Sequence, residues 1–151
     1  MSASVPQAVL FACAFNAVRS PMAAALMRAL CRAPLYAASA GVRVAELDPF
    51  AVAVMDEIGI DISAHRPITF EELEDLEGLN FDLIVTLSPE AHHKALALTH
   101  RLAAEVEYWP TADPTAAEGN REQRLEAYRE VRDQLIARIR ARFLPPPIGN
   151  V

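Results

Sequence analysis

Apolar runs and helix-period patterns alternate along the 151 residues of this chain. Residues 8–12 form a continuous run of small and branched apolar side chains, which is typical of a strand buried on both faces. Shorter runs predict further strands over residues 35–41, 81–87 and 106–109. The segments between and after these runs carry helix signals instead.

The helix signals are capping residues and apolar residues at helical spacing. Ser20, Asp48 and Ser88 each precede a proline, and a cap followed by proline predicts a helix start. Thr69 and Glu72 have the spacing of a capping box. We predict helices over residues 21–32, 48–59, 69–77 and 88–104, and a long helix after residue 120. The apolar positions of this last helix are Leu125, Tyr128, Val131, Leu135, Ile136, Ile139 and Phe143.

Strands and helices that alternate without repeats predict an α/β fold, with a parallel sheet and helices on both of its faces. Ligands of such sheets bind outside the carboxyl ends of the strands. Two loops are expected to meet at that edge. One follows the first strand and contains Cys13, and the other follows the fourth strand and contains Asp113.

The composition narrows the class of protein. Apolar residues make up 52% and charged residues 23% of the chain, as in folded globular domains. A net charge of −6 argues against nucleic acid as a partner. Two cysteines make no disulfide framework, which favours a reducing, cytoplasmic setting. We expect neither a signal peptide nor a membrane span, because the chain has no suitable apolar run.

The loop after the first strand has the features of an anion site. Cys13 follows the strand, Arg19 comes six positions later, and Ser20 and Pro21 open a helix. A helix N-terminus offers free N–H groups and the positive end of the helix dipole. That field and Arg19 favour the thiolate form of Cys13, which is the nucleophilic form. A buried core cysteine is the alternative for this residue type.

The segment from Cys13 through Arg19, Ser20 and Pro21 to Ala23 resembles the phosphate loop of the low-molecular-weight protein tyrosine phosphatases and of the arsenate reductases that share their fold. Further segments, 39–41, 59–66, 81–85 and 113–114, are similar to family segments at suitable distances. The resemblance covers nearly the whole chain. We expect one domain over residues 1–151 with an irregular tail over 144–151, and a doubly wound four-stranded sheet of order 2-1-3-4.

The resemblance implies roles for the loop residues. Cys13 would attack phosphorus and form a cysteinyl-phosphate, and Arg19 would hold two phosphate oxygens at once. Asn16 would brace the loop, and Ser20 would donate a hydrogen bond to the Cys13 sulfur. The phosphate-binding set, mostly through backbone N–H groups, would be Ala14, Phe15, Asn16, Ala17, Val18, Arg19 and Ser20.

Asp113 would protonate the departing oxygen and then activate water, as the resemblance implies. The alternative is structural, because an Asp-Pro pair commonly starts a turn. No metal and no other cofactor is expected, since arginine and amides would stabilise the charge.

Three positions depart from the family pattern. Phe15 stands where the loop usually has glycine, so a positive φ there would strain the backbone unless the side chain points outward. Val18 replaces a second loop cysteine, which removes protection of Cys13 by a disulfide. Thr115 replaces a tyrosine of the eukaryotic members, so an aromatic wall for phosphotyrosine is missing.

Membership of the arsenate reductase branch is the second hypothesis for the function. Trp109, the 113–114 and 118–119 pairs, and residues 128–133 look closer to that branch. Its thioredoxin-coupled members need two further cysteines after the third strand, and this chain has Ser88 where the first would be. Reduction by a small external thiol would need Cys13 alone. A non-catalytic oxyanion-binding module is the third reading.

The remaining candidates favour structural roles. Cys31 is predicted to be a core residue, since the helix carries it far from the loop. His92 and His93 point about 100 degrees apart on a helix, so they cannot share one metal ion. His65 and Arg66 are predicted to lie in a solvated loop, and a position near the rim of the site is the alternative. The leading hypothesis is therefore a metal-independent phosphatase whose partners are phosphorylated proteins or small aryl phosphates.

Overall fold

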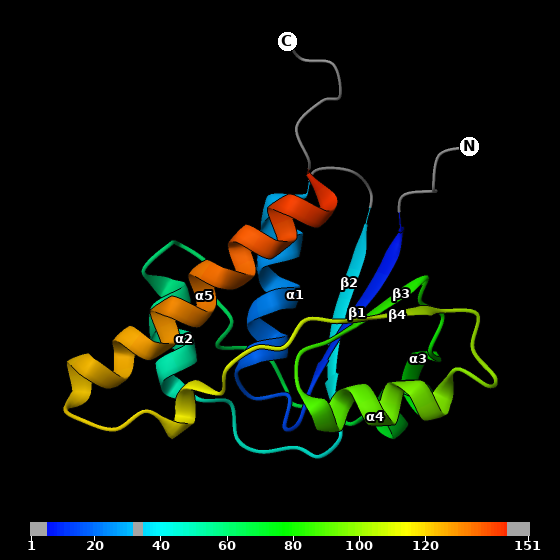
Figure 1. The fold of residues 1–151 in the computed structure, drawn as a ribbon, viewed down its shortest axis with the longest axis horizontal. Coiled ribbons are helices and arrows are strands. Elements are labelled where there is room, and N and C mark those ends of the chain that lie inside the picture. Colours follow the sequence, from blue (N-terminus) through cyan, green and yellow to red (C-terminus); the bar gives the residue numbers. More distant parts are fainter. Residues whose placement is uncertain (1–5, 32–34, 145–151) are drawn as a thin grey trace, which may run out of the picture.

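The centre of the computed structural model, which describes residues 6–31 and 35–144, is a four-stranded parallel sheet (Figure 1). The order across the sheet is β2-β1-β3-β4 and each neighbouring pair is parallel, which confirms the predicted fold class and strand order. The part of the predicted tail beyond residue 144 lies outside the described residues. The strands are β1 (Ala8–Cys13), β2 (Tyr36–Gly41), β3 (Leu83–Thr86) and β4 (Glu105–Tyr108).

Five α-helices and one short 3₁₀ helix complete the described part of the chain. Three predicted caps are confirmed: the side chains of Asp48, Thr69 and Ser88 each accept a hydrogen bond from a backbone N–H of the first turn. No helix in this part is both long and apolar enough to cross a membrane. The helices are α1 (Arg19–Leu30), α2 (Pro49–Asp56), α3 (Phe70–Glu77), α4 (Pro89–Leu98), η1 (Pro114–Ala116) and α5 (Arg121–Phe143).

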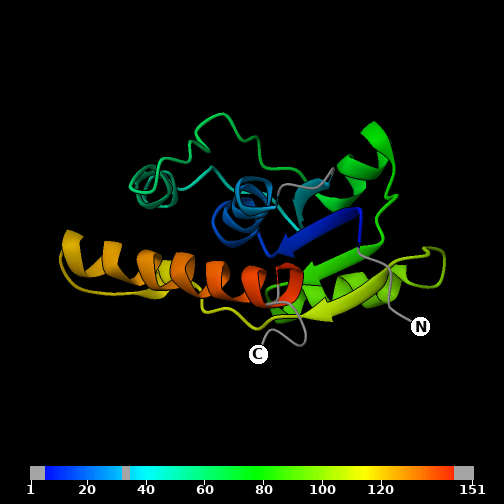
Figure 2. The same cartoon turned by 90° about the horizontal axis from the view of Figure 1, so that it is seen from above.

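Strand β1 is buried on both faces, as its apolar run predicts. Successive side chains of a strand point to opposite faces. Val9, Phe11 and Cys13 therefore join the core with α1 and α5, whereas Leu10 and Ala12 join the core with α3 and α4. Figure 2 shows the two groups of helices on opposite sides of the strands, with α2 lying beyond α1, away from the sheet.

Helix α1 begins at Arg19, so the prediction that Ser20 is its N-cap is wrong. Val18 occupies the cap position and its side chain makes no capping bond. The Ser-Pro signal was misleading because the Ser20 hydroxyl turns toward the Cys13 sulfur instead of the helix N–H groups.

Helix α4 ends at Leu98, and the prediction of a helix as far as residue 104 is wrong. Both the backbone N–H and the hydroxyl of Thr99 donate to the Leu96 carbonyl, which tightens the last turn. The chain then has to reverse, because β4 begins at Glu105 with a hydrogen bond from its N–H to the Asp82 carbonyl.

Candidate active site

The loop after β1, residues 14–18, presents its N–H groups on one side because its carbonyls are occupied on the other. The carbonyls of Cys13, Ala14, Phe15 and Ala17 accept hydrogen bonds from backbone N–H groups within residues 42–48. Across the described residues, the N–H groups of 14–18 make no hydrogen bond to a backbone carbonyl. Successive free N–H groups on one side form an anion-binding concavity. The loop N–H groups are therefore free to bind an anion, and the binding of an oxyanion there stays a prediction.

Asn16 fixes this loop from behind. Its side-chain NH₂ donates to the hydroxyls of Ser20 and Ser39, both at 2.9 Å, and its Oδ1 accepts from the Ile68 N–H at 2.9 Å. Asn16 is fully buried, and its bonds to the two serine hydroxyls are buried as well. Its predicted bracing role agrees with this geometry, and the partners come from three separate segments of the chain.

The positive φ of the loop lies at Asn16, where φ is 55°, and not at Phe15. Asparagine tolerates this left-handed conformation better than most residues. The strain considered for Phe15 therefore does not arise. Its side chain points outward with 42% of its surface exposed, and the Arg43 guanidinium lies 5.2 Å from the centre of its ring.

His65 is half-buried behind the loop, so the prediction that it lies in a solvated segment is wrong. Burial, with a smaller contribution from Arg28, lowers the pKa of His65 and favours the neutral imidazole. Its Nε2 lies 3.0 Å from Asn16 Oδ1 and 3.3 Å from Asn16 O. Both atoms are acceptors, so Nε2 carries the proton and donates to them. These partners are 49 positions apart in the sequence, so no local pattern predicted the contact.

The Cys13 sulfur faces the cavity at the base of the loop, with 2% of the residue exposed. Ser20 Oγ lies 2.9 Å from Cys13 Sγ. Because Asn16 already donates to this oxygen, the Ser20 hydroxyl proton can point at the sulfur or at the more distant Ala40 carbonyl, 3.5 Å away. A hydrogen bond of this kind stabilises the thiolate, so Ser20 has the geometry implied for it.

Arg19 connects the loop to the segment that carries Asp113. Its guanidinium is buried and donates from Nη1 to the Thr111 carbonyl at 2.9 Å. Two residues further along, Asp113 Oδ1 accepts from both the N–H and the hydroxyl of Thr115, at 3.0 and 2.7 Å. Asp113 therefore starts a turn, as the structural interpretation predicts. It also lines the same cavity as Cys13 and Arg19.

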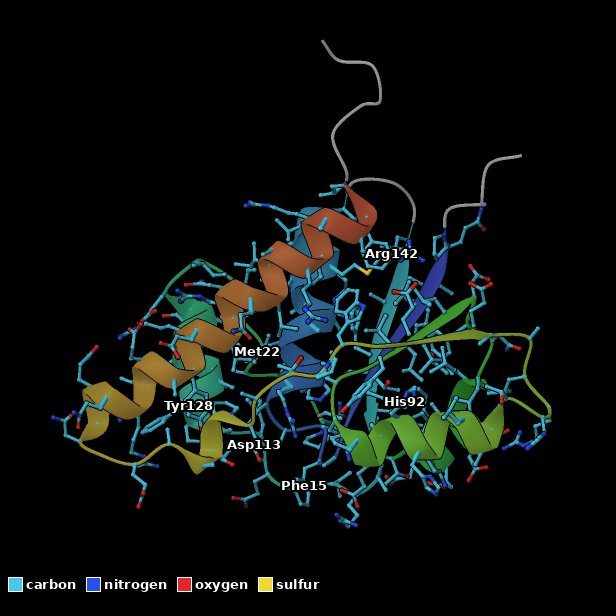
Figure 3. The ribbon with its side chains drawn as sticks, in the orientation of Figure 1. Phe15, Met22, His92, Asp113, Tyr128 and Arg142 are labelled. Carbon is cyan, nitrogen blue, oxygen red and sulfur yellow. The ribbon has the colours of Figure 1, made fainter. Side chains whose placement is uncertain are left out.

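The cavity has a volume of about 430 Å³ and opens at the carboxyl ends of the strands. Figure 3 shows Phe15 and Asp113 at this end of the molecule, with Arg142 far away at the other end of α5. Of the predicted loop residues, Cys13, Phe15, Ala17, Val18 and Arg19 line the cavity. Ala14, Asn16 and Ser20 are buried but are not part of its lining, so their side chains support the loop from behind.

The far wall of the cavity was not predicted from the sequence. Phe50, Arg124 and Tyr128 line it, together with Asp48. The Tyr128 hydroxyl donates to Asp48 Oδ2 at 2.6 Å, and the Phe50 and Tyr128 rings meet edge to face with centroids 5.4 Å apart. Burial and the Asp48 carboxylate raise the pKa of Tyr128. Phe50 and Tyr128 have helical apolar spacing, which predicts core packing and gives no signal of a cavity.

Gly41 has to be glycine because a Cβ at this position would collide with the backbone of neighbouring segments. A Cβ there would lie 2.4 Å from Arg43 O and 2.8 Å from Asn16 N. We expect Gly41→Ala to lower the free energy of unfolding by at least about 2 kcal/mol, as overpacking against backbone does, and to abolish stabilisation by inorganic phosphate in thermal unfolding. Gly59→Ala is the control: φ there is +79° but the Cβ meets nothing within 4 Å. It should lose stability and keep the response to phosphate. A Gly41→Ala protein that phosphate still stabilises would contradict this account of the loop.

The other cysteine and the remaining histidines lie outside the cavity lining. Cys31 follows α1 and packs, partly buried, against the core with α1 and α5, and burial raises the pKa of its thiol. His92 stacks on Tyr108, with ring centroids 4.6 Å apart, and contacts the Thr86 hydroxyl. Over residues 6–31 and 35–144, no three His, Cys, Asp or Glu side chains gather as a metal site would require.

Comparisons with known proteins confirm the family resemblance that the sequence indicated. The family model described as low molecular weight phosphotyrosine protein phosphatase matches residues 8–143. An arsenate reductase of Shouchella clausii is 35% identical over 134 residues, which are 87% of this chain and 91% of the relative. A low molecular weight protein tyrosine phosphatase from T. tengcongensis superimposes with a TM-score of 0.71 at 29% identity, covering 90% of this chain and 95% of the other. An arsenate reductase in its phosphate-binding state superimposes with a TM-score of 0.69 at 26% identity, covering 91% of this chain and 97% of the other.

Proposed function

The chain belongs to the low molecular weight phosphotyrosine protein phosphatase family, and we propose that it hydrolyses aryl phosphates, including phosphotyrosine in proteins. The observation that carries the proposal is that Cys13, Arg19 and Asp113 line one cavity. They offer a nucleophile, an oxyanion clamp and a proton donor, which are the groups that phosphoryl transfer through cysteine needs. A cytoplasmic setting fits the proposal, because Cys13 has to remain reduced.

In the first step, the Cys13 thiolate attacks phosphorus, the S–P bond forms and the P–O bond to the aryl group breaks. The loop N–H groups and the Arg19 guanidinium bind the phosphoryl oxygens throughout, so no metal ion is needed to stabilise their charge. The Ser20 hydroxyl lies 2.9 Å from the sulfur, where it can donate a hydrogen bond to the attacking thiolate. Asp113 gives its proton to the aryl oxygen as that oxygen leaves.

In the second step, the Asp113 carboxylate takes a proton from water, the water oxygen attacks phosphorus and the S–P bond breaks. Both hydrogen bonds from Thr115 go to Oδ1 of Asp113. They hold the carboxyl group in one orientation and leave Oδ2 for proton transfer. The turn-forming contacts of Asp113 therefore serve the proposed acid–base role as well.

Asp113→Asn should slow turnover most for substrates whose leaving group needs a proton in order to depart. For an alkyl or phenyl phosphate, whose leaving group is poor, we expect a loss in kcat of about 10²–10³-fold, as for removal of a general acid. For p-nitrophenyl phosphate, whose leaving group needs little protonation, cysteinyl-phosphate formation should be much less affected. The burst and steady-state rates of both substrates measure this. Asp61→Asn, an exposed carboxylate outside the cavity lining, is the control. Equal losses for both leaving groups in the rate of cysteinyl-phosphate formation would refute the role as general acid.

Thiol-dependent arsenate reduction is the second candidate, since curated relatives at 35% and 32% identity are named arsenate reductases. Cys13 would attack arsenate and form an S–As bond as one arsenic-bound hydroxyl leaves as water. An external thiol would then attack the sulfur, so that the S–As bond breaks and its electron pair stays on arsenic. The thiol and Cys13 then share a disulfide, and arsenic leaves as arsenite with two more electrons. A second thiol frees Cys13. The only other thiol of the chain is that of Cys31, which lies just beyond the far end of α1, about 18 Å along the helix from Arg19.

One experiment separates the candidate functions. The protein is given p-nitrophenyl phosphate and, in parallel, arsenate with glutathione. Phosphate release without arsenite supports the phosphatase, and the reverse supports the reductase. Tight phosphate binding with neither product would identify a non-catalytic oxyanion-binding module.

A further inference from the structure

Two arginines of α5 lie beside the cavity at the side away from the phosphate loop. The guanidinium carbons of Arg124 and Arg121 lie over the Phe50 ring, 4.8 and 5.1 Å from its centre. Arg124 lines the cavity together with Asp113 and Thr115. Stacking on the ring holds the two guanidinium groups in place while their N–H groups remain able to donate.

The acidic residues nearest to these arginines along the helix are engaged elsewhere. Glu122 and Glu126 both pair with Arg129, which also holds Glu57. Within residues 6–31 and 35–144, no carboxylate lies within salt-bridge distance of Arg121 or Arg124.

The acidic residues that line the cavity, Glu46, Asp48 and Asp113, form no salt bridge with the two arginines either. Asp48 uses one oxygen for the Phe50 N–H and the other for the Tyr128 hydroxyl. Glu46, which also lines the cavity, is exposed in the segment after β2. Arg121 and Arg124 also stand in the first turns of α5, where the helix dipole disfavours a cation. Stability of the helix therefore does not account for them.

We infer that Arg124, with Arg121 beside it, binds a carboxylate of the substrate next to the phosphorylated side chain, so that acidic phosphotyrosine peptides are the preferred substrates. The inference rests on the proposed phosphatase function. A cavity of about 430 Å³ has room for more than a phosphate group, and it joins the guanidinium of Arg124 to the nucleophile. Arginine pairs with carboxylates through two parallel hydrogen bonds. The contact is remote from the reacting atoms, so it acts on KM and leaves kcat unchanged.

The test uses two phosphotyrosine peptides that differ only in having Glu or Gln on both sides of the phosphotyrosine. With the wild-type protein we expect a KM about 3–10-fold lower for the Glu peptide, the size of a partly exposed ion pair. Arg124→Gln combined with Arg121→Gln should remove this difference by raising KM for the Glu peptide to the value for the Gln peptide. Arg140→Gln, an exposed arginine in the last turn of α5, is the control and should keep the preference.

Binding of the same peptides to the Cys13→Ser protein, measured by calorimetry, separates failure of this inference from failure of the proposed function. If neither peptide is hydrolysed but the Glu peptide binds more tightly in an Arg124-dependent way, acid recognition stands and the phosphatase proposal fails. Equal KM values and equal affinities for the two peptides would overturn the inference. A preference that persists in the double variant would also overturn it.

Discussion

Replacing Cys13 with serine should reduce hydrolysis of p-nitrophenyl phosphate by at least about 10³-fold, because the oxygen of serine is a far weaker nucleophile than a thiolate. Cys13 stands at the base of the loop with its sulfur 2.9 Å from the Ser20 hydroxyl. Serine keeps the size of the side chain, so the loop and its free N–H groups should be preserved. Inorganic phosphate should therefore still raise the thermal unfolding temperature of Cys13→Ser.

The matched control for this prediction is Cys31→Ser, which changes the only other cysteine of the chain. Cys31 is partly buried at the end of α1, away from the cavity lining. We expect this variant to keep its activity and to lose only a little stability. Turnover by Cys13→Ser at the wild-type rate would disprove the nucleophilic role of Cys13. Loss of activity together with loss of the phosphate response would indicate a collapsed loop instead.

Arg19→Lys should reduce kcat/KM for the same substrate by about 10²–10³-fold, the cost of removing an oxyanion-stabilising donor. The buried Arg19 side chain has two functions, since it donates to the Thr111 carbonyl and also lines the cavity beside Cys13. Lysine has a single ammonium group, which cannot grip two phosphoryl oxygens and hold the Asp113 segment at once. The loss should therefore affect both cysteinyl-phosphate formation and its hydrolysis.

Single-turnover and steady-state kinetics measure the two steps separately. Arg28→Lys is a suitable comparison, because Arg28 also donates from its guanidinium to a backbone carbonyl, that of Ala37 at 2.8 Å, but lies outside the cavity lining. We expect it to leave kcat/KM close to wild type. If the two lysine variants behaved alike, the special role of Arg19 would be wrong.

The sheet and the position of the loop could be predicted from the sequence because local signals determine them. The apolar run of β1, the proline-marked helix starts and the alternation of strands with helices are each readable within a few residues. The carboxyl edge of a parallel sheet then has to bring Cys13 and Asp113 to one end. The boundaries were less predictable: α4 stops at Leu98 because the return to β4 demands it, although the sequence continues with residues that suit a helix.

Local signals could not predict the supports of the site, because these join residues far apart in the chain. The roles expected for Asn16 and Ser20 came from the family resemblance alone. Nothing near His65 shows that it will contact Asn16, 49 positions away. Ser20 reads as a helix cap locally, and only the arrival of Asn16 and Cys13 beside its hydroxyl gives it another use. In the same way, Phe50 and Tyr128 look like ordinary core residues until α2 and α5 place them around a cavity.

The hydrogen bonds that hold the 14–18 loop come from segments spread over much of the chain: Ser39, residues 42–48, Ile68 and, through Arg19, Thr111. Ordering a residue costs about 1–2 kcal/mol of conformational entropy, which a short loop cannot recover by itself. Fragments and incompletely synthesised chains thus contain the reactive residues but lack the loop geometry that their proposed chemistry requires. Catalytic competence is consequently a cooperative property of the completed fold, and it rises and falls with the folded fraction of the protein.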